Sequence, residues 1–333
     1  MDFRLTDDQL ELQAGLEQFC TGVFPADALP AMERVGPGPD AWAALGELGL
    51  FRLRAPESDG GLGLGWVETA VVYEVLGHHL VPGPLVWTQL LAALVPGAAD
   101  GACAVTGLDL TTDPGPWLVE HPDLIGALAV LGPDGVSVVD AAALDDVERV
   151  DPLDPLTPVA RLPVVPGGTA VGDASAAAVM RVEGALLSAA LLVGLADRAL
   201  ALARMHALER EQFGRPIGAF QAVQHLLADM YVRAMLARSG VYGAAAILDD
   251  PGLHDAGVDG DALDTAVASA KVVAADAAMA NARACIQVHG GMGFTWEMMP
   301  HYLLKRAWVL EHSFGTTDRH TESIAAALGS PKS

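Results

Sequence analysis

The chain has 333 residues, of which 52% are hydrophobic and 18% are charged, and its formal net charge at pH 7 is −23. The apolar composition excludes a disordered chain and predicts an extensively buried, oligomeric protein of two or three domains. The acidic balance, without any basic stripe in the sequence, argues against nucleic acid as a partner. An anionic substrate would need local positive charge, because the overall field repels it.

The cysteine usage and the N-terminal residues predict a cytoplasmic protein. Cys20, Cys103 and Cys285 lack metal-type or redox spacing, so we expect three buried thiols in a reducing cytosol. The acidic stretch MDFRLTDDQ is not expected to be a signal peptide, and charges interrupt the longest Ala-Leu runs, so no membrane span is expected. The neighbouring His78 and His79 cannot share a helix face, so no metal site is expected.

Residues 1–100 are predicted to form a helical domain. Thr6 followed three residues later by Gln9 is a capping-box start for the first helix. Further helices are expected over 41–48 and 67–79. The glycine-rich stretch over 56–65 has no preceding strand and no closing lysine, so it is predicted to be a surface loop rather than a phosphate cradle.

Residues 101–175 are predicted to form a small β domain. Two apolar runs, 128–131 and 136–139, flank a Gly-Pro-Asp-Gly turn and indicate a β-hairpin. Residues 159–165 suggest another strand, and Pro163 within it indicates an edge position.

Residues 176–333 return to helical patterns, and they are predicted to form an antiparallel bundle domain. Long helices are expected over 182–210, 219–248 and 262–289, and shorter ones over 298–312 and 316–328. The fold class is therefore mostly α, with a small β middle domain between an N-terminal helical domain and a C-terminal four-helix bundle.

Two stretches carry the strongest chemical signals. The first, REQFGRPIGAFQAVQHLLADM, begins at Arg210 and contains a Pro-Gly bend between two helices. The second, Gln287-Val-His-Gly-Gly-Met-Gly-Phe294, closes a helix with glycines whose bare N–H groups suit phosphate oxygens. Together an arginine, a glutamine and an open Gly-Gly backbone could hold a pyrophosphate.

Both stretches resemble the acyl-CoA dehydrogenase family, whose pattern is R-x-Q-F-G-x-x-I-x-x-F-Q followed by Q-x-x-G-G-x-G-F, and the resemblance covers nearly the whole chain. It implies an FAD that lies across a dimer interface and an acyl-CoA substrate. The arginine stretch of one subunit would contact the FAD held mainly by its neighbour, and the Gly-Gly turn would hold the ADP portion. The implied FAD contacts are Arg210, Gln212, Phe213, Gln221, Gln287, Gly290, Gly291 and Thr316.

The catalytic carboxylate of this family is not found at its usual place. Most members carry a glutamate in a Tyr-Glu-Gly-Thr turn, and the matching stretch here is Ser313-Phe-Gly-Thr316, so Phe314 stands at the base position. Some relatives place the base near the start of the first bundle helix, where Gly184 matches and Glu183 is its neighbour. Glu183 is either an alternative base or a carboxylate near a helix N-terminus, where the dipole favours it. The family's CoA-contacting arginine maps to Ala185.

Three functions stay open at this stage. The retained FAD stretches and the missing base fit the non-catalytic subunit of a heterotetrameric (α2β2) acyl-CoA dehydrogenase, like those of bacterial steroid side-chain degradation, with a second, catalytic subunit as partner. A self-sufficient homo-oligomer that uses Glu183 as its base is the second. A flavin-free scaffold pseudoenzyme is the third. The Thr112-Asp-Pro-Gly115 segment is the nearest equivalent of the family's flavin-wall segment, which we expect to be lost.

Overall fold

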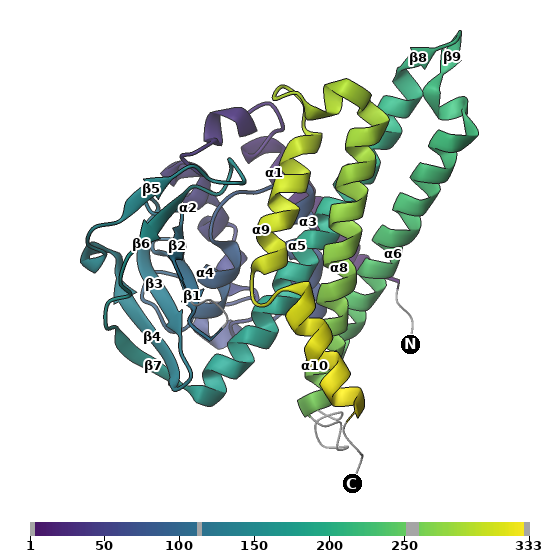
Figure 1. Cartoon of the computed structure of the whole chain (residues 1–333). Helices are drawn as coiled ribbons and strands as arrows, with labels where there is room; N and C mark the ends of the chain where they lie inside the picture. Colours follow the sequence, from purple (N-terminus) through teal and green to yellow (C-terminus); the bar gives the residue numbers. More distant parts are fainter. Residues whose placement is uncertain (1–3, 112–114, 251–259, 330–333) are drawn as a thin grey trace. The chain divides into compact units, whose positions relative to one another are not determined.

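The computed structural model describes residues 4–111, 115–250 and 260–329, so residues 112–114 of the Thr112–Gly115 segment lie outside it. The described residues divide between two compact units: Met1–Gly22, Trp66–Val81 and Ala185–Ser333 form the first, and Val23–Gly65 and Pro82–Gly184 the second. The predicted fold class, mostly α with a small β region, is confirmed (Figure 1). The three-domain division stays a prediction.

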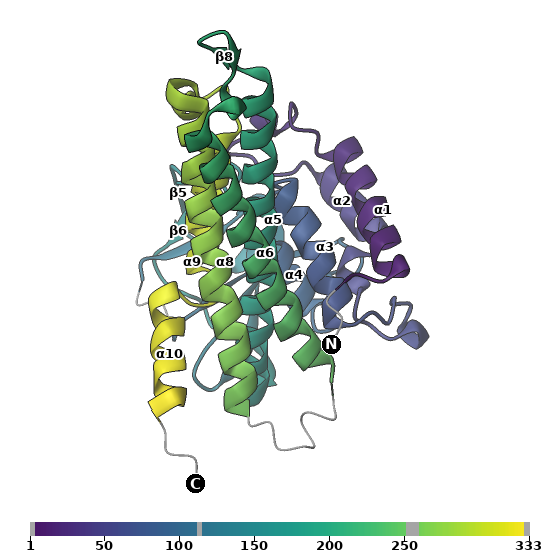
Figure 2. The ribbon, with the colours of Figure 1, turned by 90° about the vertical axis from the view of Figure 1, so that its right-hand side faces the viewer.

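The first unit is helical. Its elements are α1 (Asp7–Val23), α3 (Trp66–His78), the part of α5 (Ala174–Glu209) after Gly184, strands β8 (Glu211–Gln212) and β9 (Arg215–Pro216), α6 (Gln221–Asp249), α8 (Gly260–His289), α9 (Pro300–His312) and α10 (Thr317–Gly329). Helices α5, α6, α8 and α9 run side by side as the predicted bundle (Figures 1 and 2). The capping box also forms, since the Thr6 N–H donates to Gln9 Oε1 at 3.0 Å and the Gln9 N–H to Thr6 Oγ1 at 3.3 Å.

Helix α5 is longer than predicted, beginning at Ala174 rather than at Val182. By length and composition alone it could cross a membrane, so the expectation that no segment reaches this apolar length is wrong. However, 78% of its most apolar window is buried inside the protein, as is usual for a core helix.

Two glycines let α3 and α5 cross at backbone contact. A Cβ added to Gly77 would lie 2.1 Å from the Leu191 carbonyl oxygen. A Cβ added to Gly194 would lie 2.0 Å from the Glu74 carbonyl oxygen. Any larger residue would therefore push the two helices apart.

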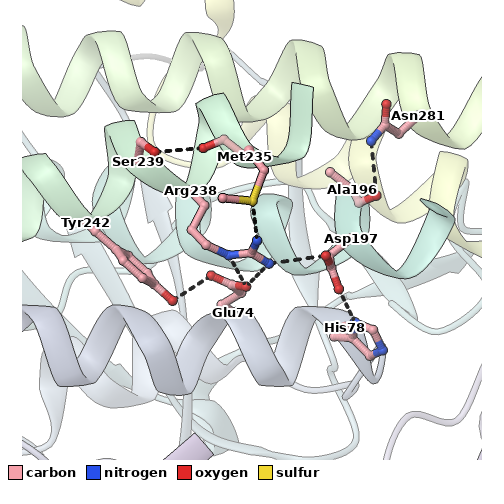
Figure 3. Close-up of polar contacts among 9 residues, drawn as sticks. All are labelled: Glu74, His78, Ala196, Asp197, Met235, Arg238, Ser239, Tyr242 and Asn281. Carbon is pink, nitrogen blue, oxygen red and sulfur yellow. Dashed lines mark hydrogen bonds and ion pairs between the residues drawn. The ribbon is translucent and has the colours of Figure 1, made fainter. Parts of the chain in front are cut away.

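A partly buried charge network joins α3, α5 and α6 beside this crossing (Figure 3). Glu74 accepts from Arg238 Nε at 2.8 Å and from the Tyr242 hydroxyl at 2.9 Å. The Arg238 guanidinium also contacts Asp197 at 3.2 Å, and Asp197 pairs with His78 at 3.2 Å. Each of these charges thus has a partner, which offsets the cost of removing it from water.

The second unit holds two sheets, with strand orders β1-β3-β4-β7 and β2-β6-β5. The strands are β1 (Ala104–Asp109), β2 (Trp117–Glu120), β3 (Ile125–Leu131), β4 (Gly135–Asp140), β5 (Glu148–Val150), β6 (Val159–Leu162) and β7 (Thr169–Asp173). The predicted hairpin is confirmed by β3 and β4, where Leu131 pairs with Val136. The edge position predicted for β6 is wrong: the strand ends at Leu162, before Pro163, so the proline does not prevent pairing on both sides.

Helices α2 (Pro39–Glu47), α4 (Leu85–Leu91) and the first turns of α5 complete the second unit. Leu91 of α4, Val105 of β1, Leu131 of β3 and Met180 of α5 belong to one buried apolar core. The Thr88 hydroxyl donates to the Val105 carbonyl at 3.1 Å and accepts from its N–H at 3.0 Å, which ties α4 to β1.

Candidate functional site

The Arg210 stretch forms a two-residue β-hairpin at the tip between α5 and α6. Gln212 pairs with Arg215, and the turn residues Phe213 and Gly214 have φ of 54° and 74°. Positive φ at both central residues matches the right-handed twist of a hairpin, and glycine accepts it without strain. Phe213 also adopts a positive φ, although its side chain is 92% exposed, so little burial offsets the strain of this conformation.

The glycines of the second stretch serve different purposes. Gly290 has φ 64°, while a Cβ on Gly290 or Gly291 would meet nothing within 4 Å. A Cβ on Gly293 would lie 2.6 Å from the Ile286 carbonyl oxygen, so this glycine allows close packing against α8. Gly290 and Gly291 therefore leave an open backbone surface just after α8.

A stacked histidine pair joins these two stretches. His206 lies one turn before Arg210, and His289 immediately precedes Gly290; their ring centroids are 4.2 Å apart with planes 20° apart. His289 is buried, and its Nδ1 hydrogen-bonds the Cys285 carbonyl at 2.8 Å. Burial, then the charges of His289 and Arg210, lower the pKa of His206. The sequence did not reveal this pair, because a lone histidine in each helix carries no spacing signal.

The hairpin and the Gly-Gly turn thus lie at the same end of the bundle (Figures 1 and 2). Seven of the predicted FAD contacts are found there: Arg210, Gln212, Phe213, Gln221, Gln287, Gly290 and Gly291. All seven are exposed within this chain, so they are accessible to a ligand or to another subunit.

The eighth predicted contact, Thr316, lies at the far end of α9, about 20 Å along a 13-residue helix. Its hydroxyl accepts from the Arg319 N–H at 3.3 Å and so caps α10. Asp318, on the first turn of α10, is exposed. The structure therefore does not bring Thr316 together with the other seven, and a single ligand would have to be extended to reach both.

Thr316 belongs to the turn Ser313-Phe314-Gly315-Thr316, where the resemblance predicts the position of the base and which we name the Phe314 turn. Phe314 and Gly315 have φ of 56° and 103°. The Phe314 side chain is 9% exposed and offers no proton acceptor. Glu311, the carboxylate nearest in sequence, accepts from the Thr317 N–H at 2.6 Å and contacts His312 Nδ1 at 2.9 Å. The Glu311 carboxylate is thus hydrogen-bonded to the first residue of α10.

Glu183 lies in the second unit and is not at a helix start, because α5 already begins at Ala174. The dipole explanation given for it is therefore wrong. Burial raises the pKa of Glu183, and Arg54, 3.4 Å away, opposes the rise. A half-buried carboxylate held by one cation is compatible with a base and equally with a structural ion pair.

Arg181, one turn before Ala185 on α5, is tied to Asp109 of β1 through two hydrogen bonds of 2.7 and 3.1 Å, and to the Gly132 carbonyl at 3.2 Å. Burial raises the pKa of Asp109, but its hydrogen bonds from Arg181 and Thr111 and the charge of Arg181 outweigh this effect and lower the pKa. Arg181 is thus engaged within its own unit and unsuited to a CoA phosphate.

The cysteines follow the sequence expectation in part. Cys20 and Cys285 are buried, and burial raises the pKa of both thiols to about 12. Cys103 is only half-buried, so the expectation that all three thiols are buried is wrong for this one. Among residues 4–111, 115–250 and 260–329, no group of three or more His, Cys, Asp or Glu side chains is placed to hold a metal.

Comparison with known proteins identifies the family. The model of the acyl-CoA dehydrogenase N-terminal domain matches residues 6–96, and that of the C-terminal domain matches residues 177–329. Acyl-CoA dehydrogenase IpdE2 of Mycolicibacterium smegmatis is 33% identical over 294 residues, which cover 85% of this chain and 86% of IpdE2. The chain belongs to the acyl-CoA dehydrogenase family. The members of this family are FAD-dependent oxidoreductases that act on CH–CH bonds.

A further relative and two solved structures match over different shares of their length. FadE34 of Mycobacterium tuberculosis is 34% identical over 313 residues, but the chain spans only 42% of it. The ChsE4–ChsE5 complex of Mycobacterium tuberculosis contains a chain with TM-score 0.83 and 23% identity, covering 100% of both chains. The Tcur3481–Tcur3483 steroid ACAD gives TM-score 0.81 and 24% identity, covering 97% and 98%. These structures show the same fold.

The described residues fit part of an acyl-CoA dehydrogenase FAD site. The open Gly290–Gly291 backbone and the exposed Gln287 amide offer donors suited to a diphosphate, and the exposed Arg210 guanidinium at the same end of the bundle is accessible to another subunit. The Phe314 turn supplies a hydroxyl and an apolar side chain but no carboxylate. The fit is therefore good for holding a cofactor and poor for abstracting a proton at this turn.

Proposed function

We propose that this chain is the non-catalytic subunit of a heterotetrameric, cytoplasmic acyl-CoA dehydrogenase and that it completes an FAD site shared with a second, catalytic subunit. FAD, when bound, supplies the hydride acceptor for α,β-dehydrogenation of an acyl-CoA thioester. The residues of this chain would hold the diphosphate through Gly290, Gly291 and Gln287, and Arg210 would reach the cofactor of the partner subunit.

The observation that carries this proposal is the contrast between the two ends of the bundle. The cofactor end keeps an exposed arginine, Arg210, and an open Gly290–Gly291 backbone. At the base position, Phe314 cannot accept the α-proton. A subunit with this combination can bind cofactor but needs a base from elsewhere.

The related structures support a partner of the same fold and suggest the substrate class. One is described as a complex of two differently named chains, ChsE4 and ChsE5, and another as a steroid ACAD. We therefore propose a steroid side-chain CoA ester as the substrate and an acyl-CoA dehydrogenase subunit that carries the glutamate base as the partner.

Glu183 supports a second candidate, a self-sufficient homo-oligomer. Its carboxyl has a pKa raised by burial, as a base working near neutral pH requires. In that case Glu183→Gln would abolish turnover of the chain purified alone, whereas the heteromeric proposal expects no turnover from the chain alone. A flavin-free scaffold would be supported instead if no assembly of the chain contained flavin.

The test is to replace Arg210 by glutamine in a complex co-expressed with a candidate catalytic subunit. Loss of one charge-assisted hydrogen bond to phosphate costs about 1.5–3 kcal/mol, so FAD affinity should fall at least about tenfold. Flavin absorbance per pair of chains after gel filtration measures the result.

The matched control is Arg34→Gln, because Arg34 is an exposed arginine paired with Asp151 at 2.8 Å, far from the stretches assigned to FAD in the sequence. This variant should keep full flavin. Equal flavin in the Arg210→Gln and wild-type complexes would refute the role assigned to the hairpin.

A further inference from the structure

Lys271 is a lysine with no exposed surface, in the middle of α8. Its Nζ donates to the Leu310 carbonyl at 2.5 Å and to the Ser313 carbonyl at 2.9 Å. Both carbonyls lie at the C-terminal end of α9, where helix carbonyls carry partial negative charge; the Leu310 carbonyl also accepts from the Ser313 N–H at 3.2 Å. An ammonium group is well suited to that position, and its two bonds hold the chain just where α9 ends.

Two other side chains hold the next residues. His320 of α10 places its Nε2 3.1 Å from the Phe314 carbonyl oxygen. A Cβ on Gly315 would lie 2.8 Å from the same His320 nitrogen, so the turn and this ring are closely packed. Glu311 accepts from the Thr317 N–H at the other end of the turn. The Phe314 turn is therefore held from α8, α9 and α10 at once.

We propose that Lys271 is a positioning residue that fixes the Phe314 turn and thereby presents Phe314 and Thr316 to the shared site. The part of the inference that concerns Thr316 and flavin rests on the proposed function, whereas the part that concerns the turn does not. Both hydrogen bonds that Lys271 donates go to backbone carbonyls, so it acts through the turn and not on a substrate. Its burial also lowers its pKa to about 7, and the charge of Glu311 opposes this shift.

The experiment compares hydrogen–deuterium exchange of the full-length wild-type chain with that of Lys271→Met. Methionine matches lysine in length and suits a fully buried position, while it removes both donors. Peptides that cover residues 309–318 should exchange at least tenfold faster in the variant, and peptides from α6 should be unchanged. Lys271→Gln, which keeps a donor, should restore part of the protection, and it replaces the methionine variant if that one does not accumulate.

The matched control is Lys305→Met, which removes a half-buried lysine of α9 whose Nζ lies 3.9 Å from the Trp296 ring centroid. Protection of residues 309–318 should be unchanged in this control. Unaltered exchange of these residues in Lys271→Met, or a uniform increase across the chain, would overturn the positioning role.

Flavin content gives a separate readout in the co-expressed complex. If the wild-type complex holds flavin, Lys271→Met should retain less flavin. Full flavin retention together with faster hydrogen–deuterium exchange of residues 309–318 would overturn the link to Thr316. If the wild-type complex holds no flavin, the proposed function fails, and the exchange comparison still decides whether Lys271 positions the turn.

Discussion

Phe213 combines backbone strain with almost complete exposure. A left-handed conformation costs a side-chain-bearing residue about 1 kcal/mol relative to glycine or asparagine. The ring makes an edge contact with Phe220, at a centroid distance of 6.1 Å, and has little other burial to offset that cost. Such a residue at the tip of a hairpin is most useful when another molecule covers it.

Replacing Phe213 by asparagine should therefore stabilise the isolated chain by about 0.5–1 kcal/mol, since asparagine accepts the left-handed conformation of this turn. The same variant should reduce flavin retention in the co-expressed complex. Urea unfolding measures the first effect and absorbance the second. Gly214→Ala, at φ 74°, is the control and should destabilise the chain. A stability loss in Phe213→Asn would show that the strain argument is incorrect.

Helix α3 receives its N-terminal cap from a residue far along the chain. The carboxylate of Asp249, the last residue of α6, accepts from the Trp66 N–H at 2.7 Å and from the Val67 N–H at 3.0 Å. These are the first amides of α3, which have no partner inside the helix. A carboxylate there also interacts favourably with the helix dipole. The end of α6 is thus tied to the start of α3.

Asp249→Ala should lower the free energy of unfolding by about 1–2 kcal/mol, because it leaves both amides without their acceptor. The measurement is urea denaturation followed by circular dichroism. Asp229→Ala, an exposed aspartate on the same helix, should change the stability by less than about 0.5 kcal/mol. Similar losses in the two variants would mean that the cap contributes nothing specific.

Elements set by local sequence were predictable, and those set by distant partners were not. The Thr6 capping box and the β3–β4 hairpin depend on residues a few positions apart, and both were predicted. Helix α4 is short, and β1 pairs in parallel with β3 across intervening chain, so neither carries a sufficient local pattern.

The candidate site shows the same division. The hairpin and the Gly-Gly turn could be located because their glycines and arginine are contiguous in sequence. The roles of Glu74 and Lys271 could not, because their partners lie 164 and about 40 positions away. A lysine in an alanine-rich helix is indistinguishable by sequence from one on a solvated face.

At the scale of the whole molecule, the net charge is −23, so a buried cation is unusual in this chain. Its titration should affect how the free energy of unfolding depends on pH. Lys271 is surrounded by backbone carbonyls, with Glu311 and His320 close enough to interact with it electrostatically, and desolvation by burial is the largest effect on its pKa. Its pKa falls from 10.5 to about 7 in the folded chain. Between these values the unfolded chain binds a proton that the folded chain does not.

The free energy of unfolding should therefore rise with pH between about 7 and 10.5, by at most about 1.4 kcal/mol per pH unit from this group. Below pH 7 both states are protonated, so the penalty is fully present and constant. The neutral amine keeps two N–H donors, so the bonds to Leu310 and Ser313 can survive its deprotonation. Urea titrations of wild type and Lys271→Met at pH 6.5, 7.5 and 8.5 isolate the effect, since all other titrating groups are common to both. The stability of the wild type relative to the variant should increase across this series, and a constant difference would mean that Lys271 stays charged throughout.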